Sequence, residues 1–175
     1  DMLDLCNITT TFASAIPPHW QAIIADWRAR ICPMRAWLTT MCHPDGEISL
    51  FNDAALGIAP TPVELERYAR ELALETPSYS LRAVMNLAQS GYIRVVQDEM
   101  VALLDVAPIG PDYLPGHAHA DTLSFELSLF GERVLVNSGT SCYGLSAERS
   151  RQRETAAHNT VVVDGQSSSE VWAGF

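Results

Sequence analysis

The segment 117–137 has the sequence HAHADTLSFELSLFGERVLVN, and it decides the fold. Polar and apolar residues alternate from Leu123 to Leu129, which is the period of a β-strand with two different faces. Gly131 and Glu132 then predict a turn, and residues 134–137 predict the strand that follows it. The stretch therefore indicates antiparallel β-structure.

The same alternation occurs elsewhere in the second half of the chain. Segments 91–96 and 100–105 predict paired strands joined by the polar turn 97–99. The run 160–163, followed by Asp164 and Gly165, predicts another strand with a hairpin turn. We therefore expect an antiparallel β domain.

Helical spacing dominates the first half of the chain. Apolar residues recur every three or four positions over 19–31, and Pro33 predicts the end of that helix. Residues 61–64, Thr-Pro-Val-Glu, have the features of a helix start with a capping box. We expect an α+β chain, with a helical domain over 1–78 and a β domain over 79–175.

Composition limits the classes of partner. The 175 residues carry a net charge of −10, from 21 Asp and Glu against 11 Lys and Arg, which argues against a nucleic-acid partner. No apolar run reaches the roughly 18 residues of a membrane-spanning helix. Because the chain opens on Asp1 rather than Met and closes on the apolar-rich run 170–175, we also expect it to be a fragment. The oligomeric state stays open.

The sharpest cluster of chemically active residues is 117–121, in which two histidines and an aspartate occupy every second position. In an extended segment these three side chains point to one face and could converge as ligands or proton carriers. His119 and His158, with an oxygen ligand such as that of Asn137, could complete a zinc-type site. Asn is a poorer ligand than Asp because it brings no negative charge. A structural histidine cluster is the alternative.

Arginines form the densest basic group of the chain, at 149, 151 and 153. A guanidinium can bind a carboxylate or sulfate through two parallel hydrogen bonds. Arg153 is the preferred candidate because it closely precedes His158. A solvated loop, in which these arginines balance neighbouring glutamates, is the competing interpretation.

Two further groups favour structural roles. Asn52 and Asp53 lie in a polar segment between predicted helices, and their composition favours turn and cap positions over a place in a cleft. The 4 cysteines are widely spaced without a CxxC pair, which favours buried thiols.

Three blocks, 115–127, 134–140 and 157–161, resemble the heparinase II/III-like family of polysaccharide lyases in their order and spacing. The segment 51–55 is similar to the family's late helical region. The resemblance implies the last helices of an incomplete α/α toroid followed by the start of an antiparallel β-sandwich. It also implies cleavage of uronate-containing polysaccharide by β-elimination, in which a base removes the C5 proton and an acid assists the leaving oxygen.

The resemblance implies roles for individual residues. His117 looks like the family's catalytic histidine, while His119 and His158 look like ligands of a zinc ion, with Asn137 where the family usually has Asp. Arg153 is predicted to bind the substrate, an anionic uronate polysaccharide such as a glycosaminoglycan, alginate or a bacterial exopolysaccharide. We expect a periplasmic or secreted protein. The family's catalytic Tyr and carboxylate-neutralising residue find no match here, so we expect the chain alone to be inactive.

Two other function classes remain as alternatives. A metal-dependent hydrolase is one, because HxHxD also opens the metal motif of the metallo-β-lactamase fold. There a second His follows the Asp, whereas this chain has Thr122 and then a predicted strand. A non-catalytic carbohydrate-binding or structural β-sandwich is the other, and it would use exposed aromatic side chains such as Tyr113, Tyr143 and Trp172.

Overall fold

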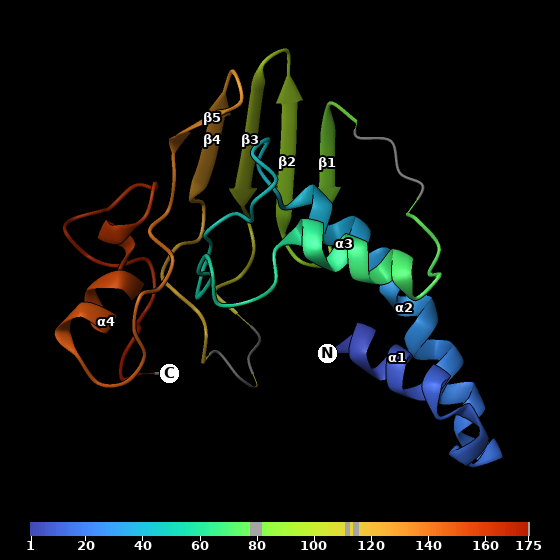
Figure 1. Cartoon of the computed structure of the whole chain (residues 1–175). Helices are drawn as coiled ribbons and strands as arrows, with labels where there is room; N and C mark the ends of the chain where they lie inside the picture. The colour runs from blue at the N-terminus through green and yellow to red at the C-terminus, as the bar shows by residue number, and fades with distance from the viewer. Residues whose placement is uncertain (78–81, 111–112, 114–115, 175) are drawn as a thin grey trace. The chain divides into compact units, whose positions relative to one another are not determined.

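The computed structural model describes residues 1–77, 82–110, 113 and 116–174. The chain divides into two compact units, one formed by 1–40 with 60–80 and the other by 41–59 with 81–175. One unit is helical and the other contains a five-stranded antiparallel sheet, which confirms the predicted α+β class (Figure 1). Within the described part of the chain, no helix is long and apolar enough to cross a bilayer.

The helical unit holds three α-helices. They are α1 (Met2–Thr11), α2 (Gln21–Thr40) and α3 (Pro62–Glu71), with short 3-10 turns at Ala13–Ala15 and Pro18–Trp20. Its core consists of Leu3, Cys6, Ile31 and Ala69. The predicted capping box is confirmed, since the Thr61 hydroxyl accepts from the amide of Glu64 and the Glu64 carboxylate accepts from the amide of Thr61.

The expected helix end at Pro33 is wrong, because α2 continues through it to Thr40. Proline removes one hydrogen bond from a helix, and a helix tolerates this loss only where other contacts hold both sides. Ile31 is buried in the core just before Pro33. Just after it, the Arg35 guanidinium donates two hydrogen bonds to Glu66, at 2.8 and 2.5 Å.

The second unit contains a sheet with strand order β1-β2-β3-β4-β5 and antiparallel neighbours throughout. The four strands expected at 91–96, 100–105, 123–129 and 134–137 are present, the second with the predicted ends and the others with shifted ends, and β1 was not predicted. The strands are β1 (Val84–Leu87), β2 (Tyr92–Gln97), β3 (Met100–Asp105), β4 (Phe125–Leu129) and β5 (Glu132–Leu135).

Strand β4 buries its polar face rather than its apolar face. Glu126 and Ser128 are fully buried, whereas the apolar residues that alternate with them along the strand are half-buried. The segment 41–59 covers the polar face, with His43 bound to Glu126 through Nε2 (2.6 Å) and to Ser128 through Nδ1 (2.7 Å). Residues 41–59 therefore pack with the sheet, although the domain prediction placed them in the helical part.

The predicted strand at 160–163 is wrong. Only an isolated bridge joins Val163 to Gln166 across the turn at Asp164 and Gly165. No strand pairs with 160–163 among the described residues, and Val161 and Val163 are 79% and 67% exposed. The same unit also contains a short helix, α4 (Ala147–Arg153), and a 3-10 turn at Thr155–Ala157.

Candidate functional site

The segment 117–121 is irregular rather than a strand, so the expectation that its three polar side chains share one face is wrong. The side chain of His117 is 69% exposed, whereas that of His119 is fully buried. Asp121 is also buried, and its carboxylate accepts a hydrogen bond from the backbone amide of Asn52 at 2.9 Å. The two histidines nevertheless meet at one group, which belongs to a distant part of the chain.

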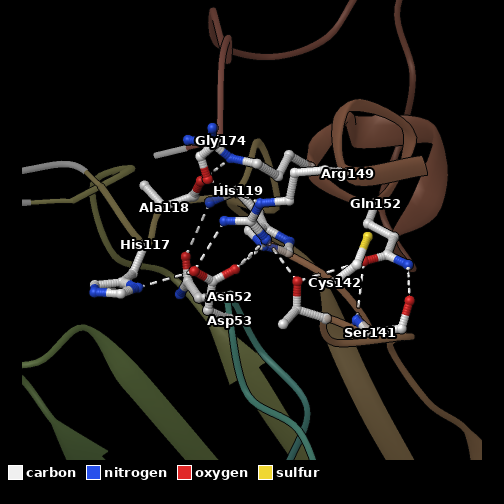
Figure 2. A network of polar contacts seen from close by, with 12 residues as sticks. Asn52, Asp53, His117, Ala118, His119, Ser141, Cys142, Arg149, Gln152 and Gly174 are labelled. Atoms are coloured by element: carbon white, nitrogen blue, oxygen red, sulfur yellow. Dashed lines mark hydrogen bonds and ion pairs between the residues drawn. The ribbon is translucent and has the colours of Figure 1, made fainter. Parts of the chain in front are cut away.

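That group is the carboxylate of Asp53, which lies between His117 and Arg149 (Figure 2). His117 Nδ1 is 2.9 Å from Oδ2, and His119 Nε2 is 2.8 Å from Oδ1. Arg149 donates to both carboxylate oxygens, with a distance of 2.9 Å from Nη2 to Oδ2. Three side chains from two segments of the chain thus bind one carboxylate.

The surroundings of Asp53 keep it ionised. Burial favours the neutral acid, but hydrogen bonds from Arg149, His119 and His117 outweigh it and lower the pKa of Asp53 to about 2. The preceding residue, Asn52, has a left-handed backbone (φ 52°), which Asn tolerates better than most residues. Its side-chain oxygen accepts from the amide of His119 at 3.1 Å, so Asn52 and Asp53 both tie this loop to the histidine segment.

Arg149 is fully buried on α4, where Ser146 caps the helix by accepting from its amide. Besides the two bonds to Asp53, its guanidinium donates to the Thr140 hydroxyl (2.5 Å) and to the Gly174 carbonyl (3.1 Å). The side chain is therefore held on several sides and fixes the carboxylate that it binds.

His158 lies against His119, as the sequence predicted for a shared site, with ring centroids 5.3 Å apart. Nδ1 of His119 and both ring nitrogens of His158 are buried without a hydrogen bond of normal geometry. Burial, and then the neighbouring His119, lower the pKa of His158 to about 4, although the backbone of Gln152 opposes the shift. Burial lowers the pKa of His119 too, against the opposing effect of Asp53. Both rings are thus neutral and able to offer lone pairs.

Asn137 is buried just after β5. Its side-chain oxygen accepts from the backbone amide of Asn159 at 3.2 Å. Its backbone amide donates to the Glu126 carboxylate at 3.1 Å. In the part of the chain that the structure describes, no three His, Cys, Asp or Glu side chains gather in a metal-binding arrangement. The buried ring nitrogens of His119 and His158 are of the donor type that a zinc ion takes, whereas the side-chain oxygen of Asn137 is uncharged and already accepts from Asn159.

Arg153 is buried, and its guanidinium donates to the carbonyls of Ala118 (2.9 Å), Trp172 (2.9 Å) and Ala173 (3.3 Å). These bonds tie the histidine segment to residues near the C-terminal end of the described chain. Contact between Arg153 and a substrate stays a prediction.

A pocket of about 830 Å³ opens beside His117. Asn52 joins His117 in its lining, and the Asn52 amide donates to the Tyr92 hydroxyl at 3.2 Å. Further lining residues are Asn86, Gln89, Ser90 and Tyr92. The exposed imidazole therefore borders a space whose lining is mostly apolar, with a few amide and hydroxyl groups among the apolar residues.

Local sequence patterns favoured turn and cap roles for Asn52 and Asp53, and Arg153 over Arg149, so they did not predict this cluster. Asp53 lies 64 positions from His117 and 96 from Arg149, and no local pattern predicts pairing over such separations. The one signal that pointed to the loop was the resemblance of 51–55 to a known family.

Comparison with protein-family models matches residues 80–175 to the family described as "Heparinase II/III-like, C-terminal". No curated protein matches the chain.

Solved structures match over most of the chain at low identity. A structure of heparinase III has a TM-score of 0.68 at 16% identity, covering 95% of this chain and 30% of that one. A mutant of the heparan sulfate lyase HepC from Pedobacter heparinus gives 0.63 at 19%, covering 82% and 25%. The heparinase III BT4657 gene product gives 0.62 at 18%, covering 95% and 28%. The chain thus has the same fold and spans less than a third of each of these proteins.

Proposed function

Because the chain belongs to the heparinase II/III-like family, we propose that it forms part of a polysaccharide lyase that cleaves uronate-containing polysaccharide by β-elimination. His117 is the proposed proton carrier. The proposal extends to a periplasmic or secreted location, where long extracellular polysaccharides are accessible to an enzyme.

One observation carries this proposal, namely that His117 is the exposed histidine of a buried polar cluster and borders a pocket. A general base must reach the substrate and must also be held in place. The ring of His117 meets both needs, because Asp53 binds Nδ1 at 2.9 Å while the side chain remains 69% exposed. The pocket, at about 830 Å³, has room for sugar units.

The chemistry explains why an imidazole suits this position. The C5 proton of a uronate lies next to a carboxylate and is only weakly acidic, so the developing negative charge must be stabilised while a base removes the proton. An imidazole exchanges protons near neutral pH, which matches this task. Within the described residues we assign no group to neutralise the substrate carboxylate.

We also propose that this unit can hold a zinc ion through His119, His158 and the oxygen of Asn137. The buried nitrogens that lack hydrogen bonds support the proposal, because imidazole nitrogen is a preferred zinc ligand. Zinc would supply a positive charge that holds the rings of His119 and His158 in place. Asp53 would then act as an outer partner, since it binds the opposite nitrogen of His119.

An assay for unsaturated products tests the lyase proposal. Heparan sulfate, alginate and a neutral glucan are incubated with the 175-residue chain and, where the reading frame extends further, with the longer protein. Product from a uronate polymer but not from the glucan is expected of the active protein, because only a uronate has the acidified C5 proton. We expect His117→Ala to reduce turnover at least about a hundredfold, the usual contribution of a general base.

The exposed histidine His19 supplies a matched control. His19→Ala removes the same side chain from the helical unit and should leave turnover unchanged. Equal turnover by the His117→Ala variant and the wild type would remove His117 from the mechanism. Saturable binding of the polymer without any turnover in the longer protein would favour the carbohydrate-binding alternative.

A further inference from the structure

The carboxylate of Asp53 binds two histidines through nitrogens of opposite type. It faces Nδ1 of His117 at 2.9 Å and Nε2 of His119 at 2.8 Å. A carboxylate only accepts hydrogen bonds, so each nitrogen that faces it must carry a proton. Neutral His117 is therefore protonated on Nδ1, with Nε2 as its acceptor atom. Neutral His119 is protonated on Nε2, with Nδ1 as its acceptor atom. Arg149 Nη1 also lies 3.4 Å from this Nε2, but the carboxylate is closer, at 2.8 Å, and Nη1 donates to it instead.

These two tautomers match the two roles that the proposed function gives these rings. The acceptor nitrogen of His119 is Nδ1, which is the buried atom without a hydrogen bond in the ring that lies against His158. The ring of His117 borders the pocket, so its acceptor nitrogen is the one that can take a proton from a bound sugar.

Asp53 can impose this choice because it is itself held in place. Arg149 donates to both of its oxygens, and the fully buried guanidinium is fixed by Thr140 and by the Gly174 carbonyl. The side chain of Asp53 is only 7% exposed, so water competes little for its oxygens. Rotation of the carboxylate would break bonds to three side chains at once.

We propose that Asp53 is a positioning residue that sets the tautomers of His117 and His119 together, and thereby links the proton carrier to the zinc-binding side of the cluster. The roles of the two histidines in this inference rest on the proposed function, whereas the tautomers themselves do not. A purely structural ion pair between Asp53 and Arg149 is the competing explanation.

Nitrogen-15 NMR of the histidine rings separates the two explanations, because it reports which ring nitrogen carries the proton. Spectra of the metal-free 175-residue chain are recorded at about pH 8, where an ordinary imidazole is neutral. The exposed His19 supplies the reference mixture of tautomers. In the wild type we expect His117 to be protonated on Nδ1 and His119 on Nε2. In Asp53→Asn we expect His117 to approach the mixture seen for His19.

Asp53→Asn also leaves Arg149 buried without its partner, which is expected to destabilise the unit strongly. The double variant Asp53→Asn with Arg149→Met removes the buried charge as well. We expect this double variant to regain thermal stability relative to Asp53→Asn while the tautomers stay altered. Restored wild-type tautomers in the double variant would overturn the proposal, as would a wild-type His117 that matches His19.

Zinc binding gives a second readout that needs no turnover. Loss of an outer partner of a metal-bound histidine typically weakens metal affinity about 10 to 100-fold. We therefore expect weaker zinc binding by Asp53→Asn in titration calorimetry. Altered tautomers together with an absence of lyase activity in the longer wild-type protein would overturn the proposed function and leave the positioning role of Asp53 standing. Tautomers that Asp53→Asn leaves unaltered, in an enzyme that is active, would overturn the positioning role of Asp53 and leave the proposed function standing.

Discussion

Asn137 is the one uncharged amide in the zinc site that we propose. It is 1% exposed, and its side-chain oxygen already accepts from the amide of Asn159. An Asp at this position would keep that acceptor and add a negative charge to two neutral imidazoles. Carboxylate oxygen is a far better zinc ligand than amide oxygen.

We therefore predict that Asn137→Asp tightens zinc binding by about tenfold or more, a change the size of one good ligand interaction. Without zinc the variant should be less stable than the wild type, because the new charge is buried and unpaired. Calorimetric titration and thermal unfolding with and without zinc measure both effects. A variant that is destabilised equally in both conditions would argue against a zinc site here.

At the level of single residues, the sequence predicted that two histidines lie together but not which groups hold them. The pairing of His119 with His158 was expected and is seen. The contact of Asp53 with His117 and His119 was not expected, because Asp53 looked like a turn residue between helices. A loop aspartate gains its role only from groups that the fold brings to it, and local sequence does not record them.

Gly139 lies where the loop that carries Asp53 meets the segment after β5. Its φ is +58°, and a Cβ there would overlap the carbonyl oxygen of Ala54. That same carbonyl accepts from the amide of Thr140 at 3.0 Å. The glycine therefore allows two segments to approach closely enough to hold the Asp53 loop in place.

We predict that Gly139→Ala destabilises the sheet unit by more than about 1 kcal/mol, because it adds a steric clash to an unfavourable backbone conformation. Gly46→Ala is the matched control, with φ +87° and no atom within 4 Å of its Cβ. Urea unfolding of both variants measures the difference. The NMR signals of His117, His119 and His158 should move in Gly139→Ala only, and equal effects of the two substitutions on stability would exclude the close approach as the cause.

Elements with a clear hydrophobic period were predicted well, and those defined by tertiary contacts were not. Strands β2, β3 and β4 followed their alternation, and α3 followed its capping box. The run 160–163 has strand-forming residues but lacks a partner among the described residues. Helix α2 continues through Pro33 because packing on both sides holds it.

At the scale of the whole chain, the net charge of −10 favours acidic side chains on the surface, where water screens their mutual repulsion. Two aspartates are nevertheless buried. Asp105 ends β3 and is 2% exposed, and Asp121 is 1% exposed. Burial, and then the nearby charge of Asp121, raise the pKa of Asp105 to about 7, although a hydrogen bond from the amide of Ala107 opposes the shift. The folded chain thus binds protons here that the unfolded chain releases.

This difference makes the stability of the sheet unit depend on pH. The pKa of Asp105 is about 7 when folded against an ordinary value of 3.8, so the folded state holds more protons between these two values and stability falls as pH rises through that window. His158 acts in the opposite direction, because its pKa of about 4 lies below the ordinary 6.5. A comparison of two chains that both contain His158 cancels its contribution.

We predict that Asp105→Asn gains stability relative to the wild type as pH rises from about 4 to 7, by a few kcal/mol at most. The amide oxygen of Asn can still accept from Ala107, as the carboxylate does at 2.9 Å, so the variant loses the ionisation and keeps the hydrogen bond. Urea unfolding at several pH values, followed through amide signals of β2 and β3, gives the two profiles. Profiles that run parallel across this range would show that Asp105 does not titrate differently in the folded chain. Profiles that continue to diverge above about pH 7 would place its folded pKa higher than burial and Asp121 account for.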